Sequence, residues 1–241
     1  MSTRRVLLWL GIACLVLAAV AVLHPDSPVY LTTLLGKGGE HDGHSTRYWM
    51  REINNADDQT RYHAIHCLGA IGADAGEAVP ALAKTMREHP DGRTRNEAAL
   101  ALSKMAPASK SAVPAMAEAL SDPDYFVRWN AANALFQLRA DARPAIPALI
   151  KAVQDDTNKT NLGTFMATVQ DMAALALGRA TTGTPEGVAV LTELLAKVTK
   201  TESRLSTVRA LGEVGPEAKS VVPQLRLLLK NDNDHWVRIA A

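Results

Sequence analysis

One stretch, residues 113–138, decides the fold, and it reads VPAMAEALSDPDYFVRWNAANALFQL. Apolar side chains recur in its first half at the spacing of a helix with one buried face. Pro114 lies near the start of that half, where the missing amide hydrogen of proline costs little. Ser121-Asp122-Pro123-Asp124 follows and places a capping side chain before a proline, which suits the start of a second helix with its own apolar series. The stretch therefore predicts two short helices joined by a turn.

The same pattern recurs from about residue 46 to residue 241. Each copy carries a basic or polar residue near the start of its second helix, which we call the anchor. The anchors are Arg61, Arg95, Arg128, Gln170, Arg204 and Arg238. They lie 34, 33, 42, 34 and 34 residues apart. A period of this length predicts a solenoid, in which each unit buries its apolar side chains against its neighbours.

These residues carry a family resemblance. Val113–Asp124, Val127-Arg128 and Ala131–Leu135 resemble a HEAT repeat of the short type also found in phycobilisome lyases, the E-Z or PBS-lyase HEAT-like type. Leu211–Ala218 resembles the end of such a repeat. The resemblance covers residues 46–241 and implies an all-α fold, a right-handed α-α superhelix of about six helical hairpins. It implies little about activity, because one repeat architecture serves many functions.

Two departures from the repeat stand out. The fourth copy has eight or nine extra residues within 155–163, and Gln170 replaces arginine as its anchor. The last copy ends early, because Ala241 aligns with Ala131 and the later apolar positions are missing. We therefore expect an incomplete last repeat in a fragment of a longer chain, and the alternative is a short capping half-repeat.

Residues 1–25 form a separate segment. Arg4 and Arg5 precede the uncharged run Val6–Leu23, which has 18 residues. As a helix this run spans roughly 27 Å, close to the ~30 Å core of a bilayer. The length of the run favours an uncleaved membrane anchor. A cleaved signal peptide is the alternative, because Ala19-Val20-Ala21 has the pattern of a cleavage site.

Either reading leaves the cations in the cytoplasm. We therefore expect a single-pass protein of a bacterial inner membrane with its repeats in the periplasm, or a secreted periplasmic protein. Residues 26–45 are rich in glycine and predict a flexible tether.

Charge and composition argue against nucleic-acid binding. The chain has 26 basic and 25 acidic residues, a net charge of +1, and 5% aromatic residues. Nucleic-acid binders carry basic stripes or aromatic stacking platforms. We therefore expect no nucleic-acid partner.

The residue types for metal or acid–base chemistry are sparse. His63 and His66 are three residues apart on the second helix of the first copy, beside Cys67, and two such side chains could bind zinc. The repeat, however, places Cys67 in the core, and the sequence fixes no third ligand. Residues 41–44, His-Asp-Gly-His, offer only adventitious metal binding. The chain has no His-Glu pair of the kind that binds di-iron in HEAT-repeat hydroxylases. We expect no catalytic residues, no metal and no cofactor, and hence no enzyme.

The arginine anchors are predicted to pair with turn aspartates, such as Asp122 or Asp124 with Arg128, in a ladder along the solenoid. Partly exposed pairs of this kind contribute about 0–1 kcal/mol each. Their expected role is to fix geometry.

A partner-binding surface is the more specific expectation. Residues one, two and five positions after an anchor should point away from the core, on the concave face of the second helices. The candidates there are Tyr62, His66, Trp129, Asn130, Asn133 and Arg209. Trp129 is equally compatible with packing against the next unit, and Trp49 and Trp236 are expected in the core or between repeats.

The leading interpretation is a non-catalytic, membrane-tethered scaffold that binds a protein or peptide. Two alternatives stay open at this point. One is a lyase-like protein that handles a bilin or another tetrapyrrole, as the family resemblance implies. The other is the repeat arm of a larger, truncated protein.

Overall fold

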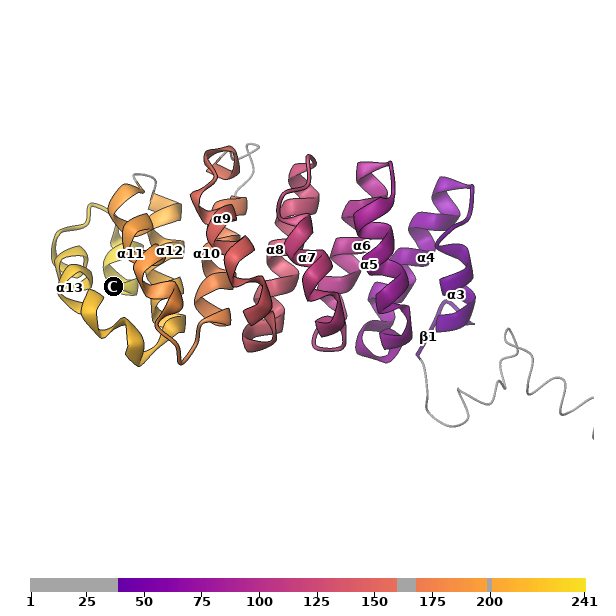
Figure 1. Cartoon of the computed structure of the whole chain (residues 1–241), viewed down its shortest axis with the longest axis horizontal. Helices are drawn as coiled ribbons and strands as arrows, with labels where there is room; N and C mark the ends of the chain where they lie inside the picture. The colour runs from indigo at the N-terminus through magenta and orange to yellow at the C-terminus, as the bar shows by residue number, and fades with distance from the viewer. Residues whose placement is uncertain (1–38, 160–167, 199–200) are drawn as a thin grey trace, which may run out of the picture.

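The computed structural model describes residues 39–159, 168–198 and 201–241. In these ranges the chain is a row of six helical hairpins, ordered from α3 at one end to α13 and the C-terminus at the other (Figure 1). The expected N-terminal hydrophobic helix lies outside the described residues. Within them, no helix has the length and apolar character needed to cross a bilayer. The all-helical solenoid predicted from the repeat is confirmed.

Each hairpin consists of a first and a second helix. The first helices are α3 (Thr46–Glu52), α5 (Val79–Glu88), α7 (Val113–Ala119), α9 (Ile146–Gln154), α11 (Glu186–Lys197) and α13 (Val222–Asn231). The second helices are α4 (Asp58–Ile71), α6 (Gly92–Lys104), α8 (Tyr125–Leu138), α10 (Val169–Ala180), α12 (Thr201–Val214) and α14 (His235–Ala240). The short 3-10 helices are η1 (Gly72–Ala78), η2 (Ala108–Ala112), η3 (Arg139–Ala145), η4 (Asp156–Lys159) and η5 (Pro216–Val221).

The core runs through the stack between the two layers of helices. Leu102 and Leu135, at equivalent repeat positions in α6 and α8, are both fully buried. Consecutive second helices pack side by side along the row. The approach of α10 to α12 is close, because a Cβ added to Gly178 would lie 2.3 Å from the carbonyl oxygen of Ala210. Small residues in the second helices thus set the spacing of the stack.

Three of the second helices are followed by a residue with a positive φ angle. Gly72 and Gly215 follow α4 and α12 with positive φ angles of 71° and 86°. Arg139 follows α8 at the equivalent position with φ of 52°, a region that side-chain-bearing residues rarely adopt. The proline near the start of α5, α7, α9 and α13 occupies the first helical turn, as expected.

A two-stranded hairpin precedes the first helix. The strands β1 (Glu40–His41) and β2 (His44–Ser45) pair in antiparallel fashion. The turn between them has positive φ at Asp42 and Gly43, as a tight two-residue turn requires. The structure here differs from the expected irregular tether, because the indole Nε1 of Trp49 donates to the carbonyl of His41 and holds the hairpin against α3.

The two tryptophans expected in the interior behave differently. Trp49 is buried, as predicted. The expectation for Trp236 is wrong, because its side chain is 64% exposed. Trp236 lies two residues before its anchor, and Phe126 at the equivalent position of α8 is also exposed. Side chains at this position point away from the stack. The same final hairpin also exposes Leu227, Leu229 and Ile239.

Candidate protein-binding surface

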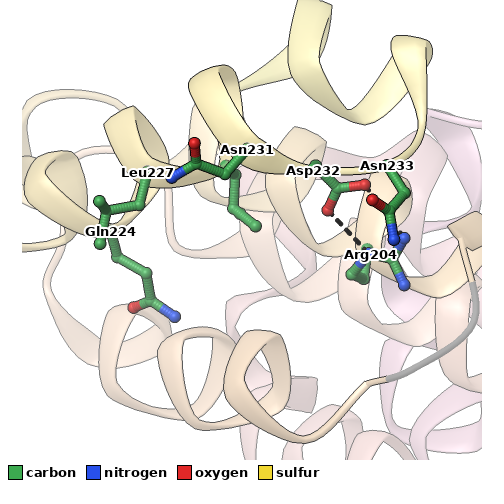
Figure 2. A pocket seen from close by; sticks show the side chains of 7 residues that line it. Arg204, Gln224, Leu227, Asn231, Asp232 and Asn233 are labelled. Atoms are coloured by element: carbon green, nitrogen blue, oxygen red, sulfur yellow. Dashed lines mark hydrogen bonds and ion pairs between the residues drawn. The ribbon is translucent and has the colours of Figure 1, made fainter.

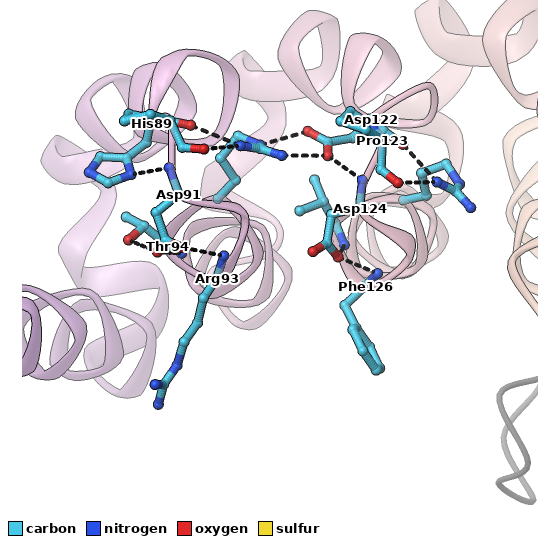
Figure 3. Close-up of polar contacts among 12 residues, drawn as sticks. His89, Asp91, Arg93, Thr94, Asp122, Pro123, Asp124 and Phe126 are labelled. Atoms are coloured by element: carbon cyan, nitrogen blue, oxygen red, sulfur yellow. Dashed lines mark hydrogen bonds and ion pairs between the residues drawn. The ribbon is translucent and has the colours of Figure 1, made fainter.

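The anchors link consecutive hairpins along one edge of the row. Nε and Nη2 of Arg95 donate to the two carboxylate oxygens of Asp122 at 2.8 and 2.9 Å. Nη1 of Arg95 donates to the carbonyls of His89 and Pro90 in its own hairpin, both at 3.0 Å (Figure 3). The arginine therefore binds its own turn and the following turn at once. Both side chains are largely buried, at 12% and 10% exposure.

The predicted partner of Arg128 is wrong. Its Nε donates to Asn158 at 2.9 Å, and its Nη1 donates to the main-chain carbonyl of Asp122 at 2.7 Å. The carboxylate of Asp122 is instead bound by Arg95 of the preceding hairpin. Asp232 plays the same double role. Its carboxylate binds Arg204 (Figure 2), and its carbonyl accepts from Arg238. The ladder thus joins neighbouring hairpins.

The remaining anchors show how the ladder adapts to sequence. The short side chain of Gln170 donates to the carbonyl of Val153 at 2.6 Å, within its own hairpin. Arg61 meets Asp58 in its own helix and donates to the hydroxyl of Thr94 in the next hairpin at 3.4 Å. The hydrogen bonds of the anchors fix the register of the second helices. They therefore also position the side chains that those helices expose.

The predicted site residues fall into three groups. Tyr62 is half-buried on α4, and its hydroxyl donates to Asp91, the N-cap residue of α6, at 2.9 Å. The guanidinium of Arg93 lies 4.4 Å from the centre of the Tyr62 ring. Trp129 is half-buried on α8. Tyr62 and Trp129 therefore lie on second helices that α6 separates.

Two predicted residues hold the stack together. Asn130 is only 7% exposed, and its Nδ2 donates to Asn96 of α6 at 2.6 Å. Asn133 donates to the hydroxyl of Ser103 of α6 at 2.9 Å. The expectation that Asn130 points away from the core is therefore wrong, because this position faces the preceding second helix. The two amides join α8 to α6.

The last two predicted residues are exposed but isolated. His66 is exposed on α4, and Arg209 is exposed on α12. Since α10 separates α12 from α8, the structure does not bring Arg209 together with Trp129.

Sequence reasoning missed two neighbours of the predicted aromatic residues. Phe126 is 51% exposed on α8, one helical turn before Trp129. Arg93 and Phe126 start equivalent second helices and point away from the stack on the same side (Figure 3). The signal that could have found them is the spacing of three residues between Phe126 and Trp129, which places both on one helix face. We call Tyr62, Arg93, Phe126 and Trp129 the aromatic patch.

The helix caps beside this patch are anionic. The hydroxyl of Thr94 donates to Asp91 and lowers the pKa of that carboxyl, with further hydrogen bonds from the Thr94 amide and Tyr62. The hydroxyl of Thr60 likewise lowers the pKa of Asp57. Both caps are therefore carboxylates at neutral pH. The patch combines aromatic surface with one cation and bordering anions.

A pocket of about 390 Å³ lies between α12 and α13. It is open and shallow, and its lining includes Gln224 and Leu227 as well as the paired Arg204 and Asp232 (Figure 2). Because those two charged side chains bind each other, neither is poised for acid–base chemistry. The pocket therefore adds no candidate catalytic group.

Solved structures with this architecture include designed proteins. Two engineered proteins match at 25% and 22% identity, with TM-scores of 0.58 and 0.62; they cover 81% and 83% of this chain, and 92% and 96% of their own. A computationally designed armadillo repeat protein for modular peptide recognition matches at 18% identity and a TM-score of 0.57, over 80% of this chain and 95% of its own. No curated protein matches the chain significantly.

The family model for HEAT repeats matches residues 48–110, 106–164 and 165–241. These three segments together span the whole row of hairpins, from α3 to α14. The inter-hairpin ladder and the continuous core follow the same repeat. The chain belongs to the HEAT-repeat family.

Proposed function

We propose that this protein is a non-catalytic scaffold that binds a protein or peptide across the second helices, on the concave side of the stack. The observation that carries the proposal is the exposure of Phe126 beside Trp129 on a rigid helix face. Aromatic residues and arginine are the types that dominate binding energy at protein interfaces. The aromatic patch presents three aromatic side chains and Arg93 on adjacent helices.

The contacts around the patch favour a preorganised surface. Tyr62 is fixed by Asp91 and covered by Arg93, and α8 is tied to α6 through Asn130 and Asn133. A rigid surface loses little conformational entropy on binding. We expect the partner to place apolar side chains against Phe126 and Trp129 and a carboxylate near Arg93. The similar architecture of a designed armadillo repeat protein for modular peptide recognition supports a peptide as the partner.

The test is selection of peptides from a displayed random library on the purified protein. Selected peptides should lose at least about tenfold in affinity for Phe126→Ala and Trp129→Ala, as expected of hot-spot residues worth more than about 1.4 kcal/mol. The matched control is Phe136→Ala, an aromatic residue of the same helix that lies under Arg179. Peptides that bind all three variants equally would place the site elsewhere.

We further propose that the scaffold is tethered to a bacterial inner membrane through Val6–Leu23, with its repeats in the periplasm. The supporting observation is the uncharged run of 18 residues after Arg4 and Arg5. A phosphatase reporter that is active only outside the cytoplasm, fused after Ala241, should be active. The substitution Leu15→Arg should release the chain from membranes, since a charge at the centre of a span costs about 2.5–3.5 kcal/mol. An inactive reporter would contradict the orientation.

We also assign the repeats to the short E-Z or PBS-lyase HEAT-like type, on the residues of Leu211–Ala218. This assignment concerns the repeat type alone and adds no lyase activity to the proposal.

A further inference from the structure

We infer that the junction between the β1–β2 hairpin and α4 is a zinc-binding site, with Asp42 and Cys67 at its centre and the imidazoles of His41 and His63 on either side. The inference is independent of the proposed protein-binding function. It rests on four side chains of metal-binding type that two separate elements bring together.

The ligand atoms form two overlapping triads that share Asp42 and Cys67. Single ligand atoms of His41, Asp42 and Cys67 all lie within 4.8 Å of one another. His63 completes the second triad, with its Nε2 3.1 Å from Oδ2 of Asp42 and 3.6 Å from Sγ of Cys67. Sγ of Cys67 lies 3.9 Å from the same Asp42 oxygen. Nε2 of His41 lies 3.7 Å from the other.

These separations suit a tetrahedral ion. Zinc binds thiolate sulfur at about 2.3 Å, and imidazole nitrogen and carboxylate oxygen at about 2.0–2.2 Å. Ligand atoms around one tetrahedral ion are therefore about 3.3–3.6 Å apart. The pairs made by Asp42, His63 and Cys67 are close to this range. The ring of His41 is 37% exposed, so it can turn toward the shared pair without repacking the core.

The element that carries His41 and Asp42 is held firmly in place. Trp49 donates to the carbonyl of His41 at 3.1 Å, and its ring meets that of His63 edge-on with centroids 5.1 Å apart. The hydroxyl of Thr46 donates to the carbonyl of Gly39 at 3.2 Å. A Cβ on Gly39 would lie 2.1 Å from Ile71, so only glycine lets the chain pass this close to α4. The supporting contacts orient the proposed ligands as metal sites require.

Cys67 is the exception at its repeat position. The equivalent residues of the next four second helices are all alanine: Ala101, Ala134, Ala176 and Ala210. Packing at this position therefore needs only a small side chain. The sulfur atom adds a soft ligand, and soft thiolates combined with imidazoles favour zinc over magnesium or calcium.

Four protein ligands would make a closed, structural site. The ion would bind the N-terminal hairpin to α4, and so cover the first of the described repeats. Capping of terminal repeats is a general need of solenoids. Binding releases the thiol proton of Cys67 to solvent, because the thiolate is the ligand.

The test uses the full-length chain in detergent with Co²⁺ and Zn²⁺ as probes. One Co²⁺ per chain should give the visible absorption of a tetrahedral ion and a thiolate charge-transfer band, and one Zn²⁺ should displace it. Cys67→Ala should abolish the charge-transfer band. His63→Ala and His41→Ala should each weaken affinity by at least about tenfold. His66→Ala is the control, since His66 is exposed on the same helix but outside the cluster.

A second readout guards against variants that unfold. The alanine at equivalent positions indicates that Cys67→Ala folds, which far-ultraviolet circular dichroism checks. Zinc should raise the melting temperature of the wild type and of His66→Ala, and leave Cys67→Ala unchanged. A cobalt spectrum of the wild type without a thiolate band would overturn the site. Equal losses of metal affinity in His66→Ala and His63→Ala would also overturn it and indicate dispersed surface binding.

Discussion

The carboxylate of Asp122 accepts two hydrogen bonds from Arg95 of the preceding hairpin, while its main-chain carbonyl accepts one from Arg128 of its own. One residue therefore couples two repeats. Its Oδ1 also accepts from the amide of Asp124, which caps α8. The turn between the helices of a hairpin thus transmits the position of one repeat to the next.

The Arg95–Asp122 pair should contribute more to stability than a surface ion pair, because both side chains are largely buried and the contact is bidentate. A double-mutant cycle with Arg95→Met and Asp122→Asn, followed by urea unfolding, should give a coupling free energy of about 1.5–3 kcal/mol. The exposed pair Glu193–Lys197 is the control, with about 0.3–0.5 kcal/mol expected. Equal coupling in the two cycles would show that the ladder does not hold the repeats together.

Gly178 should tolerate no side chain, since an added Cβ would meet the Ala210 carbonyl at 2.3 Å. Gly178→Ala should lower the free energy of unfolding by about 1–3 kcal/mol through overpacking. Gly212 occupies the equivalent position of α12, where an added Cβ meets nothing within 4 Å. Gly212→Ala should be neutral or stabilising by up to about 1 kcal/mol. Chemical denaturation of both variants checks this, and a neutral Gly178→Ala would contradict the close approach of α10 and α12.

Replacement of Arg139 by glycine should stabilise the protein. Its φ of 52° and ψ of −126° match Gly72, with 71° and −136°, and Gly215, with 86° and −142°. A non-glycine residue in such a conformation costs about 1–3 kcal/mol. Arg139→Gly should therefore raise the free energy of unfolding by about 1 kcal/mol after the greater entropy of glycine in the unfolded chain is subtracted. Arg139→Ala keeps the strain and serves as the control; an equal gain in both variants would exclude backbone relief as the cause.

The sequence was sufficient to predict the helical repeat, because buried positions such as Leu102 and Leu135 follow helical spacing. It could not assign the partner of Arg128. Asp122 lies six residues before Arg128 and 27 residues after Arg95, and only the stacking of hairpins decides between them. It also could not place Asn130, since a polar residue next to a tryptophan that was expected on the surface reads as surface until the neighbouring helix supplies Asn96 as partner.

The N-terminal hairpin was beyond sequence prediction for a different reason. Strands of two residues, β1 and β2, are too short to show alternation. Their pairing depends on the contact of Trp49 with His41. The proximity of Asp42 to Cys67 is therefore a tertiary feature that the sequence pattern does not show.

Stability should fall in acid. Hydrogen bonds from Arg204 lower the pKa of Asp232 below its ordinary value of 3.8. The unfolded state therefore binds more protons as the pH falls, and the stabilisation present above about pH 4 is lost below it. Urea midpoints measured from about pH 7 down to pH 3 should show this fall. Asp232→Asn should be less stable at neutral pH and should show a shallower acid slope. An identical slope would mean that Asp232 does not contribute.

Binding across the second helices is the central claim, and site-specific photo-crosslinking tests it most directly. The photoreactive residue benzoylphenylalanine is placed at Phe126 of α8, which is exposed in the aromatic patch. In a second variant it replaces Lys84, which is exposed on the first helix α5. With a library-selected peptide, we predict a covalent adduct from position 126 and none from position 84. Crosslinking from position 84 alone, or equally from both positions, would contradict the account.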